Sequence, residues 1–264
     1  RLISTIPKDC EIIVVDDEDL LLAAKMNKGA RQAKGEYLFF VDDDNYLKDG
    51  ALTEMLKYFN ESIGVMGMTA CYHDKKRIVA DGGSRRCMLT GFTEGVFTNK
   101  GIYDCKFFSW DGADNGNNGN VYEVDEAANA FMIRREIFED SGGFDEENFP
   151  IDLDEADLCK RIKDMGYRIV YNPKAICYHK SQTYSAMPDF RRRLNAYTLA
   201  NHKLRYQRKY LNALSYWVHV VVFLPLHICV YTISLLWRKK FQMLIPFYHG
   251  VIDGLLNRRT NKYK

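Results

Sequence analysis

Short apolar runs that end in acidic residues are the clearest pattern along the chain. Residues 37–41 (YLFFV) are rich in aromatic and branched side chains, which predicts a buried strand, and three aspartates follow at 42–44. Residues 11–15 (EIIVV) predict a second such strand, followed by acids at 16–19. Helical spacing over residues 20–34 separates the two. A strand, helix and strand in this order would bring both acidic groups to one edge of a parallel sheet.

Further predicted elements lie on both sides of a long irregular region. Residues 72–120 are rich in Gly and Asn and have neither helical nor strand periodicity, which predicts a loop region that is functional or disordered. The run 111–120 faintly resembles a calcium loop but lacks its terminal Glu. Helices are predicted at 49–59 and 134–141, and strands at 64–70, 121–131, 167–171 and 175–178, the last leading to His179.

A second acidic cluster precedes another predicted helix. It consists of Asp152, Asp154, Glu155 and Asp157, and apolar residues then recur at helical spacing until Gly166. Helix capping explains one such acid, because the N-terminus of a helix favours negative charge. Four acids exceed what a cap needs, so we expect some of them to have a chemical role. Capping stays the alternative for Asp152 or Asp154.

The aspartates at 42–44 form a candidate cation site. Three adjacent carboxylates repel one another, and a bound cation would relieve that repulsion. Oxygen-rich sites suit Mg²⁺ or Mn²⁺, and Mg²⁺ is usually held by one or two carboxylates together with substrate phosphates. The alternative is a solvated acidic turn, because Asp and Asn are common in turns.

Composition excludes several classes of protein. The chain has 264 residues and a formal net charge of +2, which gives no electrostatic case for nucleic-acid binding. Its seven cysteines are scattered without a CxxC pair, so neither a zinc ribbon nor a disulfide framework is indicated, and a reducing compartment is favoured. The sequence starts at Arg1 without a signal-peptide pattern, and we expect it to begin inside a domain whose first strand is missing.

The last third of the chain predicts helices that contact a membrane. Residues 189–210 read as a basic amphipathic helix, either a solvated one or one that lies on anionic lipid. Residues 213–237 contain no Asp, Glu, Lys or Arg and are long enough to cross a bilayer. Basic residues flank both ends of this segment, which disfavours a single crossing. A hairpin broken at Pro225, or a helix in the membrane plane, is therefore predicted.

Residues 241–256 predict one more helix at the membrane interface. The whole pattern divides the chain into a catalytic α/β domain at 1–188 and a membrane-associating helical region at 189–264. Location at the cytoplasmic face of the cell membrane follows from the basic flanks. The alternative is that the apolar helices are buried or form a dimer contact.

Several segments, in this order and spacing, resemble the inverting glycosyltransferases of family 2, which have the nucleotide-sugar-binding GT-A fold. That fold is a Rossmann-like, mostly parallel sheet flanked by helices. The 42–44 run matches the DxD element of the family. The other matching segments are EIIVVDD at 11–17, NKGARQAKGEY at 27–37, SGGFDE at 141–146, DEADLCKR at 154–161 and GYRIVYNPKAICYH at 166–179.

The resemblance implies a role for each matching position. Asp16 or Asp17 would bind the base of a UDP-, GDP- or dTDP-linked sugar, and Asp43 would lie near the ribose. The divalent metal, Mg²⁺ or Mn²⁺, would be held by Asp42, Asp44 and His179.

The second acidic cluster would supply the catalytic base. Glu155 occupies the position of the base in the family's Glu-Asp-x-Asp element, but this chain reads Asp-Glu-Ala-Asp, so Asp154 is an alternative. Asp157 and Arg161 would line the acceptor site. The implied reaction transfers a sugar to a hydroxyl of a lipid-linked or cell-surface glycan.

Two other functions compete with this interpretation. A sugar-phosphate nucleotidyltransferase should have a Gly-rich, basic phosphate loop near its start, and none is visible. A degenerate carbohydrate- or cation-binding module is the non-enzymatic alternative. It is suggested by departures from the family pattern, such as Asn129-Ala130 where Gly-Ala is common and the short segment at 17–27.

Overall fold

The computed structural model describes residues 2–72, 78–81, 83–95, 121–127, 129–179 and 187–259. These residues form two compact units. We call residues 1–85, 93–145 and 155–181 the sheet unit, and residues 86–92, 146–154 and 182–264 the helical unit. The calcium-like run at 111–120 lies outside the described residues. Two short segments, 86–92 and 146–154, join the helical unit although both lie within the predicted catalytic domain at 1–188.

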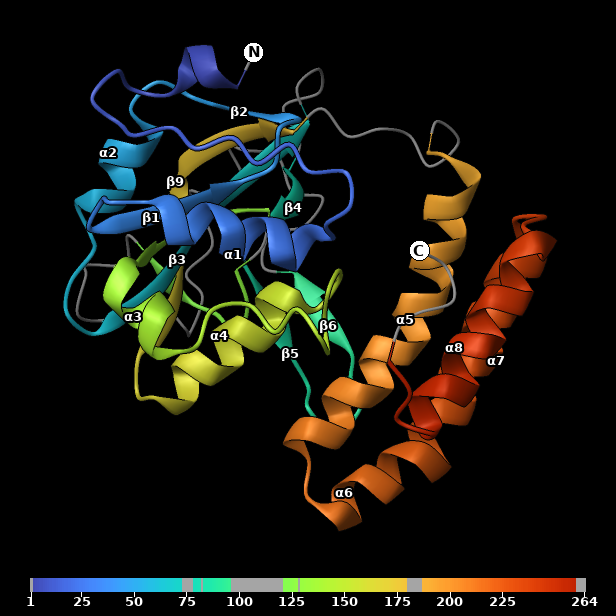
Figure 1. The fold of residues 1–264 in the computed structure, drawn as a ribbon. Coiled ribbons are helices and arrows are strands. Elements are labelled where there is room, and N and C mark those ends of the chain that lie inside the picture. Colours follow the sequence, from blue (N-terminus) through green and yellow to red (C-terminus); the bar gives the residue numbers. More distant parts are fainter. Residues whose placement is uncertain are drawn as a thin grey trace. The chain divides into compact units, whose positions relative to one another are not determined.

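The sheet unit is built on a mixed sheet (Figure 1). β1, β3 and β9 run in the same direction, and β8 lies antiparallel between β1 and β3. Among the described strands, only β3 and β9 pair directly in parallel, while β4 adds to β3 and β7 adds to β9, both antiparallel. The order is β1 (Tyr37–Val41), β8 (Ala130–Arg134), β3 (Ile63–Tyr72), β9 (Arg168–His179) and β2 (Asn45–Leu47), with β4 (Ile78–Asp81) and β7 (Tyr122–Glu123) off this path.

Helices cover both faces of this sheet, which is why its strands are apolar on both sides. In β1, Leu38 and Phe40 belong to one apolar cluster, whereas Tyr37 and Phe39 pack against the other. The first cluster includes residues of α1 (Leu22–Gln32), α3 (Arg135–Asp140) and α4 (Asp154–Asp164), and the second includes residues of α2 (Ala51–Leu56). A short helix, η1 (Ile3–Thr5), and a two-stranded sheet of β5 (Ser84–Arg86) and β6 (Thr93–Gly95) complete the elements before the helical unit.

The predicted strand at 11–15 does not form. The segment has no regular secondary structure and pairs with no strand among the described residues, and Ile12 and Val14 are 42% and 69% exposed. Val15 instead lies close to Gly29 of α1. An apolar run becomes a strand only if a neighbouring strand accepts its backbone hydrogen bonds, and sequence alone does not reveal that neighbour.

The two strands predicted around Pro173 form one strand, β9. The pairing of β3 with β9 changes register between Met68 and Thr69, so that Asn172 and Ile176 become the partners of successive residues. Pro173 lies within the resulting bulge, and Thr69 Oγ1 donates to its carbonyl at 3.2 Å. A bulge tolerates proline because it leaves a residue outside the ladder of hydrogen bonds.

The helical unit contains α5 (Asp189–Tyr210), α6 (Ala213–Val218), the π-helical turn η4 (His219–Phe223), α7 (Leu224–Trp237), η5 (Phe241–Met243) and α8 (Leu244–Leu255). The sequence left α5 as either a solvated amphipathic helix or one that lies on anionic lipid, but eleven of its 22 residues are buried. Gly250 and Gly254 of α8 allow a close approach, since a Cβ at Gly254 would lie 2.9 Å from Leu204 Cβ. α5 is therefore a packed helix.

The hairpin predicted at Pro225 is also wrong. α6, η4 and α7 form one continuous helix from Ala213 to Trp237, and Pro225 lies in the first turn of α7, directly after η4. A proline lacks the N–H that an α-helix uses, and a wider π turn just before it accommodates this change. By length and composition this helix could cross a membrane, and 11% of its most apolar window is buried.

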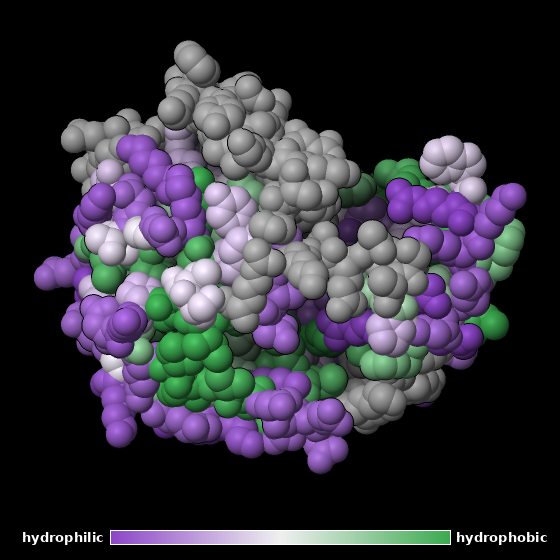
Figure 2. Space-filling model, turned by 90° about the horizontal axis from the view of Figure 1, so that it is seen from above, coloured by the Kyte–Doolittle hydropathy of each residue, from purple (hydrophilic) through white to green (hydrophobic). Residues whose placement is uncertain are grey.

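Surface polarity varies over the described part of the chain. Figure 2 shows one face, on which hydrophobic residues (green) gather in a patch among mainly hydrophilic ones (purple). The helix from Ala213 to Trp237 carries many exposed apolar side chains. They include Leu214, Trp217, Val221, Val222, Leu226, Val230, Ile233 and Trp237, each more than half exposed.

Candidate active site

The carboxyl ends of three strands meet at one edge of the sheet. Tyr72 at the end of β3 pairs with His179 at the end of β9, and β2 brings Asn45 opposite the same histidine. Val41 ends β1 opposite Ala130, the first residue of β8. Residues 42–44 follow β1 directly, so these three aspartates lie at this edge. Ligands of α/β sheets typically bind there.

Asp44 and His179 form the centre of this edge. Asp44 Oδ2 lies 3.2 Å from His179 Nε2, and the two side chains are 34% and 20% exposed. Asn45 donates from Nδ2 to Asp44 Oδ1 at 3.4 Å, which helps to orient the carboxylate. The sequence placed these two residues 135 positions apart in one metal site, and the fold brings them into contact. A carboxylate oxygen and an imidazole nitrogen in contact can share a cation or a proton.

This pair fits a divalent metal that also binds substrate. Ligands about 2.1 Å from an ion lie roughly 3 Å apart when they occupy adjacent octahedral positions. Among the described residues there is no group of three or more His, Cys, Asp and Glu side chains that could hold a metal. Two protein ligands suit Mg²⁺ or Mn²⁺ only if phosphate oxygens supply others, which is how Mg²⁺ is commonly bound.

The neighbouring acids are less engaged in this contact. The backbone N–H of Asn45 donates to the carbonyl of Asp42 at 3.1 Å, which closes the turn after β1. Asp42 is partly exposed and Asp43 is exposed. Burial raises the pKa of the Cys177 thiol to about 12, and the charges of Asp44 and Asp42 add to this effect. Both carboxylates therefore lie near Cys177 on β9, whose thiol stays neutral.

One acid of the second cluster, Glu155, lies in the sheet unit near the same edge. Cys159 Sγ contacts the carbonyl of Ala127 at 4.0 Å, three residues before β8 begins opposite Val41. Burial raises the pKa of Cys159 to about 12, with the charges of Glu126 and Glu155 adding to this effect. Glu155 therefore lies near the loop that leads into β8. This chain of contacts places it at the same end of the sheet as residues 42–44.

Exposure distinguishes the acids of this cluster. Asp154, the first residue of α4, is 1% exposed, and Asp157 is fully buried. Glu155 is partly exposed. A base must reach the hydroxyl proton that it removes. Of the three, Glu155 is the one that solvent can reach.

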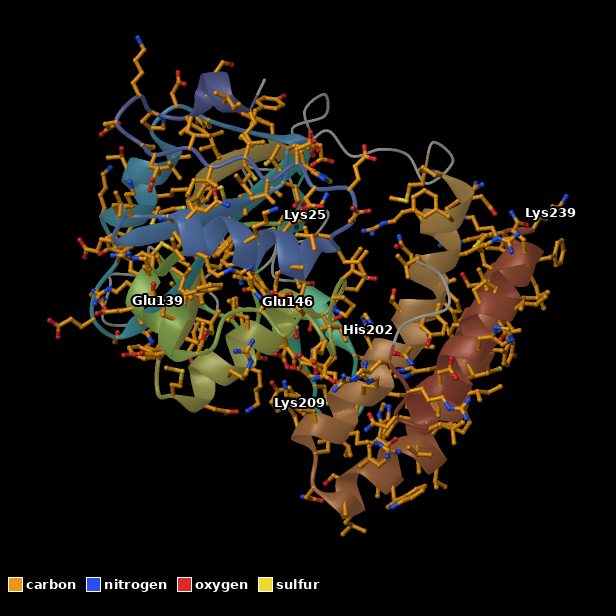
Figure 3. All side chains as sticks on the ribbon, in the orientation of Figure 1. Lys25, Glu139, Glu146, His202, Lys209 and Lys239 are labelled. Carbon is orange, nitrogen blue, oxygen red and sulfur yellow. The ribbon has the colours of Figure 1, made fainter. Side chains whose placement is uncertain are left out.

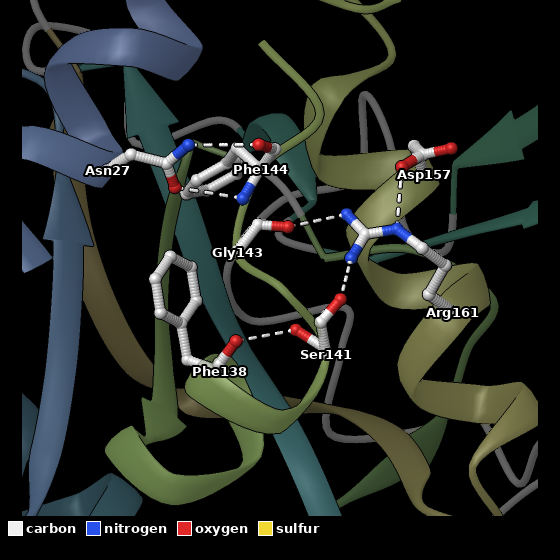
Figure 4. A network of polar contacts seen from close by, with 7 residues as sticks. All are labelled: Asn27, Phe138, Ser141, Gly143, Phe144, Asp157 and Arg161. Carbon is white, nitrogen blue, oxygen red and sulfur yellow. Dashed lines mark hydrogen bonds and ion pairs between the residues drawn. The ribbon is translucent and has the colours of Figure 1, made fainter.

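Asp157 and Arg161 belong to a network that holds three helices together (Figure 4). Arg161 Nε donates to the buried Asp157 Oδ2 at 2.8 Å, and its terminal nitrogens donate to the carbonyls of Ser141 and Gly143, the latter at 2.6 Å. Asn27 of α1 exchanges two hydrogen bonds of 2.9 Å with the backbone of Phe144. These contacts favour a positioning role for Asp157 and Arg161 rather than contact with an acceptor.

The departure at Asn129 preserves the local backbone. Asn129 has φ 64°, in the left-handed region that glycine adopts most easily. Asparagine is one of the few other residues that tolerates this conformation. The replacement of the family's Gly-Ala by Asn129-Ala130 is therefore compatible with an intact turn before β8.

Asp16 and Asp17, the two candidates for binding the base, differ in their contacts. Lys28 Nζ donates to Asp17 Oδ2 at 2.8 Å, and this hydrogen bond lowers the pKa of Asp17. Asp16 is exposed. Asp17 is thus already bound to α1, and Asp16 is the more available of the two for a ligand.

Sequence reasoning missed a set of contacts in the helical unit that fixes the segment before α4. Asp152 and Leu153 have φ 59° and 62°, which is strained for non-glycine residues. Thr198 Oγ1 donates to Asp152 Oδ2 at 2.5 Å, and His202 Nδ1 lies 3.1 Å from the Asp152 carbonyl. Arg205 donates to the Asn148 carbonyl at 3.0 Å. A Thr, His and Arg at helical spacing within the presumed amphipathic helix were the available signal.

Comparisons with solved structures give similarities of low TM-score. GalNAc-T7 with UDP, GalNAc and Mn²⁺ has 13% identity and a TM-score of 0.49, with 73% of this chain and 35% of that chain covered. A mannosyltransferase from Pyrobaculum calidifontis with GDP-Man and Mn²⁺ has 15% identity and a TM-score of 0.44, with 89% and 67% covered. TarS from S. aureus has 17% identity and a TM-score of 0.37, with 71% and 30% covered. We draw no argument from these values.

Sequence comparison is decisive. No curated protein sequence matches the chain significantly. The profile described as "Glycosyltransferase like family 2" matches residues 12–197, which is most of the chain. This match includes the 42–44 aspartates, the α4 acids and His179, and it confirms the α/β GT-A fold that the resemblance implied. The chain belongs to glycosyltransferase-like family 2.

Proposed function

We propose that the chain is a metal-dependent inverting glycosyltransferase. It would move a sugar from a nucleotide-sugar donor to a hydroxyl of a lipid-linked or cell-surface glycan, at the cytoplasmic face of a membrane. The contact of Asp44 with His179 at the sheet edge is the observation that supports this most directly.

In this proposal the aspartates at 42–44 and the acids of α4 have different roles. Asp44 and His179, with Asp42, would hold Mg²⁺ or Mn²⁺ against the donor diphosphate. The metal would act as a Lewis acid that neutralises the charge of the leaving diphosphate. Asp16 would contact the base and Asp43 the ribose, and Asp17 would support Asp16 from its ion pair with Lys28.

Glu155 would act as the general base. It would take the proton of the acceptor hydroxyl while the hydroxyl oxygen forms its bond to the anomeric carbon. The bond between that carbon and the diphosphate oxygen breaks on the opposite face, which inverts the configuration. The reaction releases nucleoside diphosphate, and the proton stays on Glu155 until solvent removes it. Partial exposure of Glu155, against the burial of Asp154, favours this assignment.

Membrane association rests on the exposed apolar side chains of the helix from Ala213 to Trp237. Soluble monomers rarely expose apolar patches larger than a few hundred Å². Trp217 and Trp237, at 59% and 83% exposure, are residues that favour membrane interfaces. Lys239, exposed just after α7 (Figure 3), could contact anionic headgroups.

The decisive experiment compares donor binding and turnover in the same protein. Calorimetry with a panel of UDP-, GDP- and dTDP-sugars, with and without Mn²⁺, should identify one donor whose binding needs the metal. Hydrolysis or transfer of that donor should fall by about 10²- to 10⁴-fold in Glu155→Gln, the usual contribution of a general base. Donor affinity should stay within about twofold, because the carboxamide keeps the shape of the side chain.

Asp154→Asn is the matched control for this experiment. If it alone abolishes turnover, the base is Asp154. Metal-dependent binding without turnover, unchanged by Glu155→Gln, would identify a non-catalytic binding module. Release of pyrophosphate from a nucleoside triphosphate and a sugar phosphate would identify a nucleotidyltransferase instead.

A further inference from the structure

The helical unit encloses a cavity of about 250 Å³. Its walls come from α5, α7 and α8 together with Phe92, and they are mainly apolar. Leu204, Leu224, Phe247 and Val251 are buried members of one apolar cluster there. Leu199 and Val230, which also line the cavity, are 46% and 57% exposed. The cavity is therefore continuous with the exposed apolar surface of α7.

One end of this cavity is polar and has unused hydrogen-bonding capacity. Lys203 Nζ lies 3.3 Å from His227 Nε2, so the ammonium donates to that nitrogen and the imidazole carries its proton on Nδ1. The buried Nδ1 of His227 has no hydrogen-bond partner among the described residues. His219 is fully buried, and its Nδ1 lies 2.8 Å from the carbonyl of Leu89, to which it must donate. The buried Nε2 of His219 is therefore an acceptor, and it has no partner among the described residues.

Gln207 and Gly91 lie beside the polar end, next to Lys203. Both side-chain polar atoms of the fully buried Gln207 lack a hydrogen-bond partner within the part of the chain that the structure describes. Gly91, at φ 66°, leaves open the space around them, because a Cβ there would overlap Gln207 Nε2 and lie 2.6 Å from Lys203 Cε. A larger residue at this position would close the approach to Lys203. Buried polar atoms without protein partners are rare, and a bound water, ion or ligand usually satisfies them.

The charge of this end is positive. Lys203 contacts the ring face of Phe92, with Nζ 5.2 Å from the centroid, and pairs with no carboxylate of the described chain. Burial lowers the pKa of Lys203 to about 8, with the charge of Arg86 adding to this effect, so the ammonium is still the major form at pH 7. A cation in an apolar cavity without a counter-ion is unfavourable, and a bound anion would remove that cost.

We propose that this cavity binds an amphiphile that has one apolar chain and a phosphate monoester head. The head would accept hydrogen bonds from Lys203 Nζ and His227 Nδ1. Because such a phosphate has its second pKa near 6, its singly protonated form can also donate to His219 Nε2, which a carboxylate cannot do. The apolar chain of the ligand would lie among Leu204, Phe247 and Val251 and leave the cavity past Val230. This site is separate from donor binding and does not depend on transfer.

Photo-crosslinking of the full chain in a nonionic detergent tests this proposal. The probe is a dodecyl phosphate with a diazirine at the end of its chain, and no nucleotide sugar is added. We expect labelled peptides from α7 and α8, and we expect dodecyl phosphate to compete with the probe. Inorganic phosphate and dodecanol should compete at least tenfold more weakly. Equal competition by dodecanol would overturn the proposal, because it would show only an apolar cleft. Equal competition by inorganic phosphate would also overturn it, because it would show only an anion site.

Variants separate the head from the chain. Lys203→Met keeps the apolar stem and should weaken competition by dodecyl phosphate at least tenfold, whereas Lys203→Arg should retain it. Val230→Trp should block the mouth of the cavity and reduce labelling. Lys34→Met, which removes an exposed lysine of the sheet unit, is the matched control and should change nothing.

The outcome does not depend on how well one variant folds. If Lys203→Met unfolds, loss of labelling in Val230→Trp together with retention in Lys203→Arg still supports the site. Unchanged labelling in both Lys203→Met and Val230→Trp would refute it. Crosslinks between two copies of the chain at these helices would show that the surface is instead a dimer contact.

Discussion

The sheet unit and the helical unit distribute polar and apolar side chains in opposite ways. In the sheet unit, apolar clusters cover both faces of the sheet and the acids gather at its edge. In the helical unit, Asn201, Gln207 and His219 are fully buried, whereas Val221 and Trp237 are 68% and 83% exposed. Water favours the first distribution. The second is stable where an apolar surrounding replaces water on one face, as in a membrane.

In the proposed function, this difference gives each unit a separate task. The acids at the sheet edge are suited to a charged, water-soluble donor. The exposed apolar helix from Ala213 to Trp237 is suited to a lipid surface. The basic side chains of α5, in contrast, mostly make contacts within the helical unit. Arg208, for example, donates to the carbonyl of Leu255 at 2.8 Å, and Arg193 pairs with Asp189 on the same helix. Variants can therefore damage one task and leave the other intact.

The largest expected effect is on the stability of the sheet unit. Arg161→Met leaves the fully buried Asp157 without its cation and frees the carbonyls of Ser141 and Gly143. Removal of one partner from a buried ion pair typically costs about 3–5 kcal/mol. Urea unfolding of the full chain, followed by far-UV circular dichroism, measures this loss. Arg193→Met, which breaks an exposed pair, should cost less than about 1 kcal/mol. Equal losses of unfolding free energy in both variants would show that the contacts of Arg161 do not stabilise the sheet unit.

The second effect is on donor binding. Asp44→Ala should weaken metal-dependent binding of the nucleotide sugar by at least about 100-fold, because outer residues around a metal already contribute about 10- to 100-fold. His179→Ala should weaken it less, since histidine contributes no negative charge. Calorimetry with Mn²⁺ and with EDTA measures both. Asp49→Ala, which removes an exposed carboxylate a few residues along the chain, is the control. Normal affinity in Asp44→Ala would refute the metal assignment.

The third effect concerns pH and the contact of α5 with Asp152. His202 is fully buried on α5 (Figure 3), and burial lowers its pKa from 6.5 to about 4, although the nearby Asp152 opposes this shift and Arg205 adds to it. The unfolded chain therefore binds a proton at a higher pH than the folded chain. Stability should fall as the pH drops from 6.5 towards 4, by roughly 2–3 kcal/mol at most.

His202→Gln removes this titration while it keeps a side chain that can donate to Asp152. Its free energy of unfolding should be flatter than that of the parent chain between pH 6.5 and 4. Urea titrations at pH 7, 6, 5 and 4.5 make the comparison. Parallel curves for the two proteins would show that His202 is not the group responsible.

The smallest effect is on the apolar surface of the helical unit. Val221→Gln should reduce partition of the chain into anionic vesicles by about tenfold, because burial of one valine side chain contributes about 1.5 kcal/mol. Stability without vesicles should change by less than about 0.5 kcal/mol, since Val221 is exposed. Leu56→Gln removes a 46% exposed leucine from α2 of the sheet unit and should leave partition unchanged. Equal effects on partition would show that the helical unit is not the membrane contact.

Sequence patterns by themselves determined the elements whose signals are local. Strand β1, helices α1 and α4, and the acids at their ends follow from the spacing of apolar residues and from short-range charge. The motifs also identified Asp44 and His179 as one site, and the structure brings these two side chains into contact. Residues 11–15 had the same apolar pattern as β1, but they form no strand in the structure.

Only the tertiary structure decided what depends on neighbours distant in sequence. It buried Asp157 against Arg161 and left Glu155 accessible, although both stand in one motif. It also turned the basic α5 into a packed helix with Lys203 in a cavity. Burial and pairing are properties of the space around a residue, and identical local patterns can be placed in different surroundings. The physical reason is that a strand, an ion pair or a cavity needs partners from elsewhere in the chain.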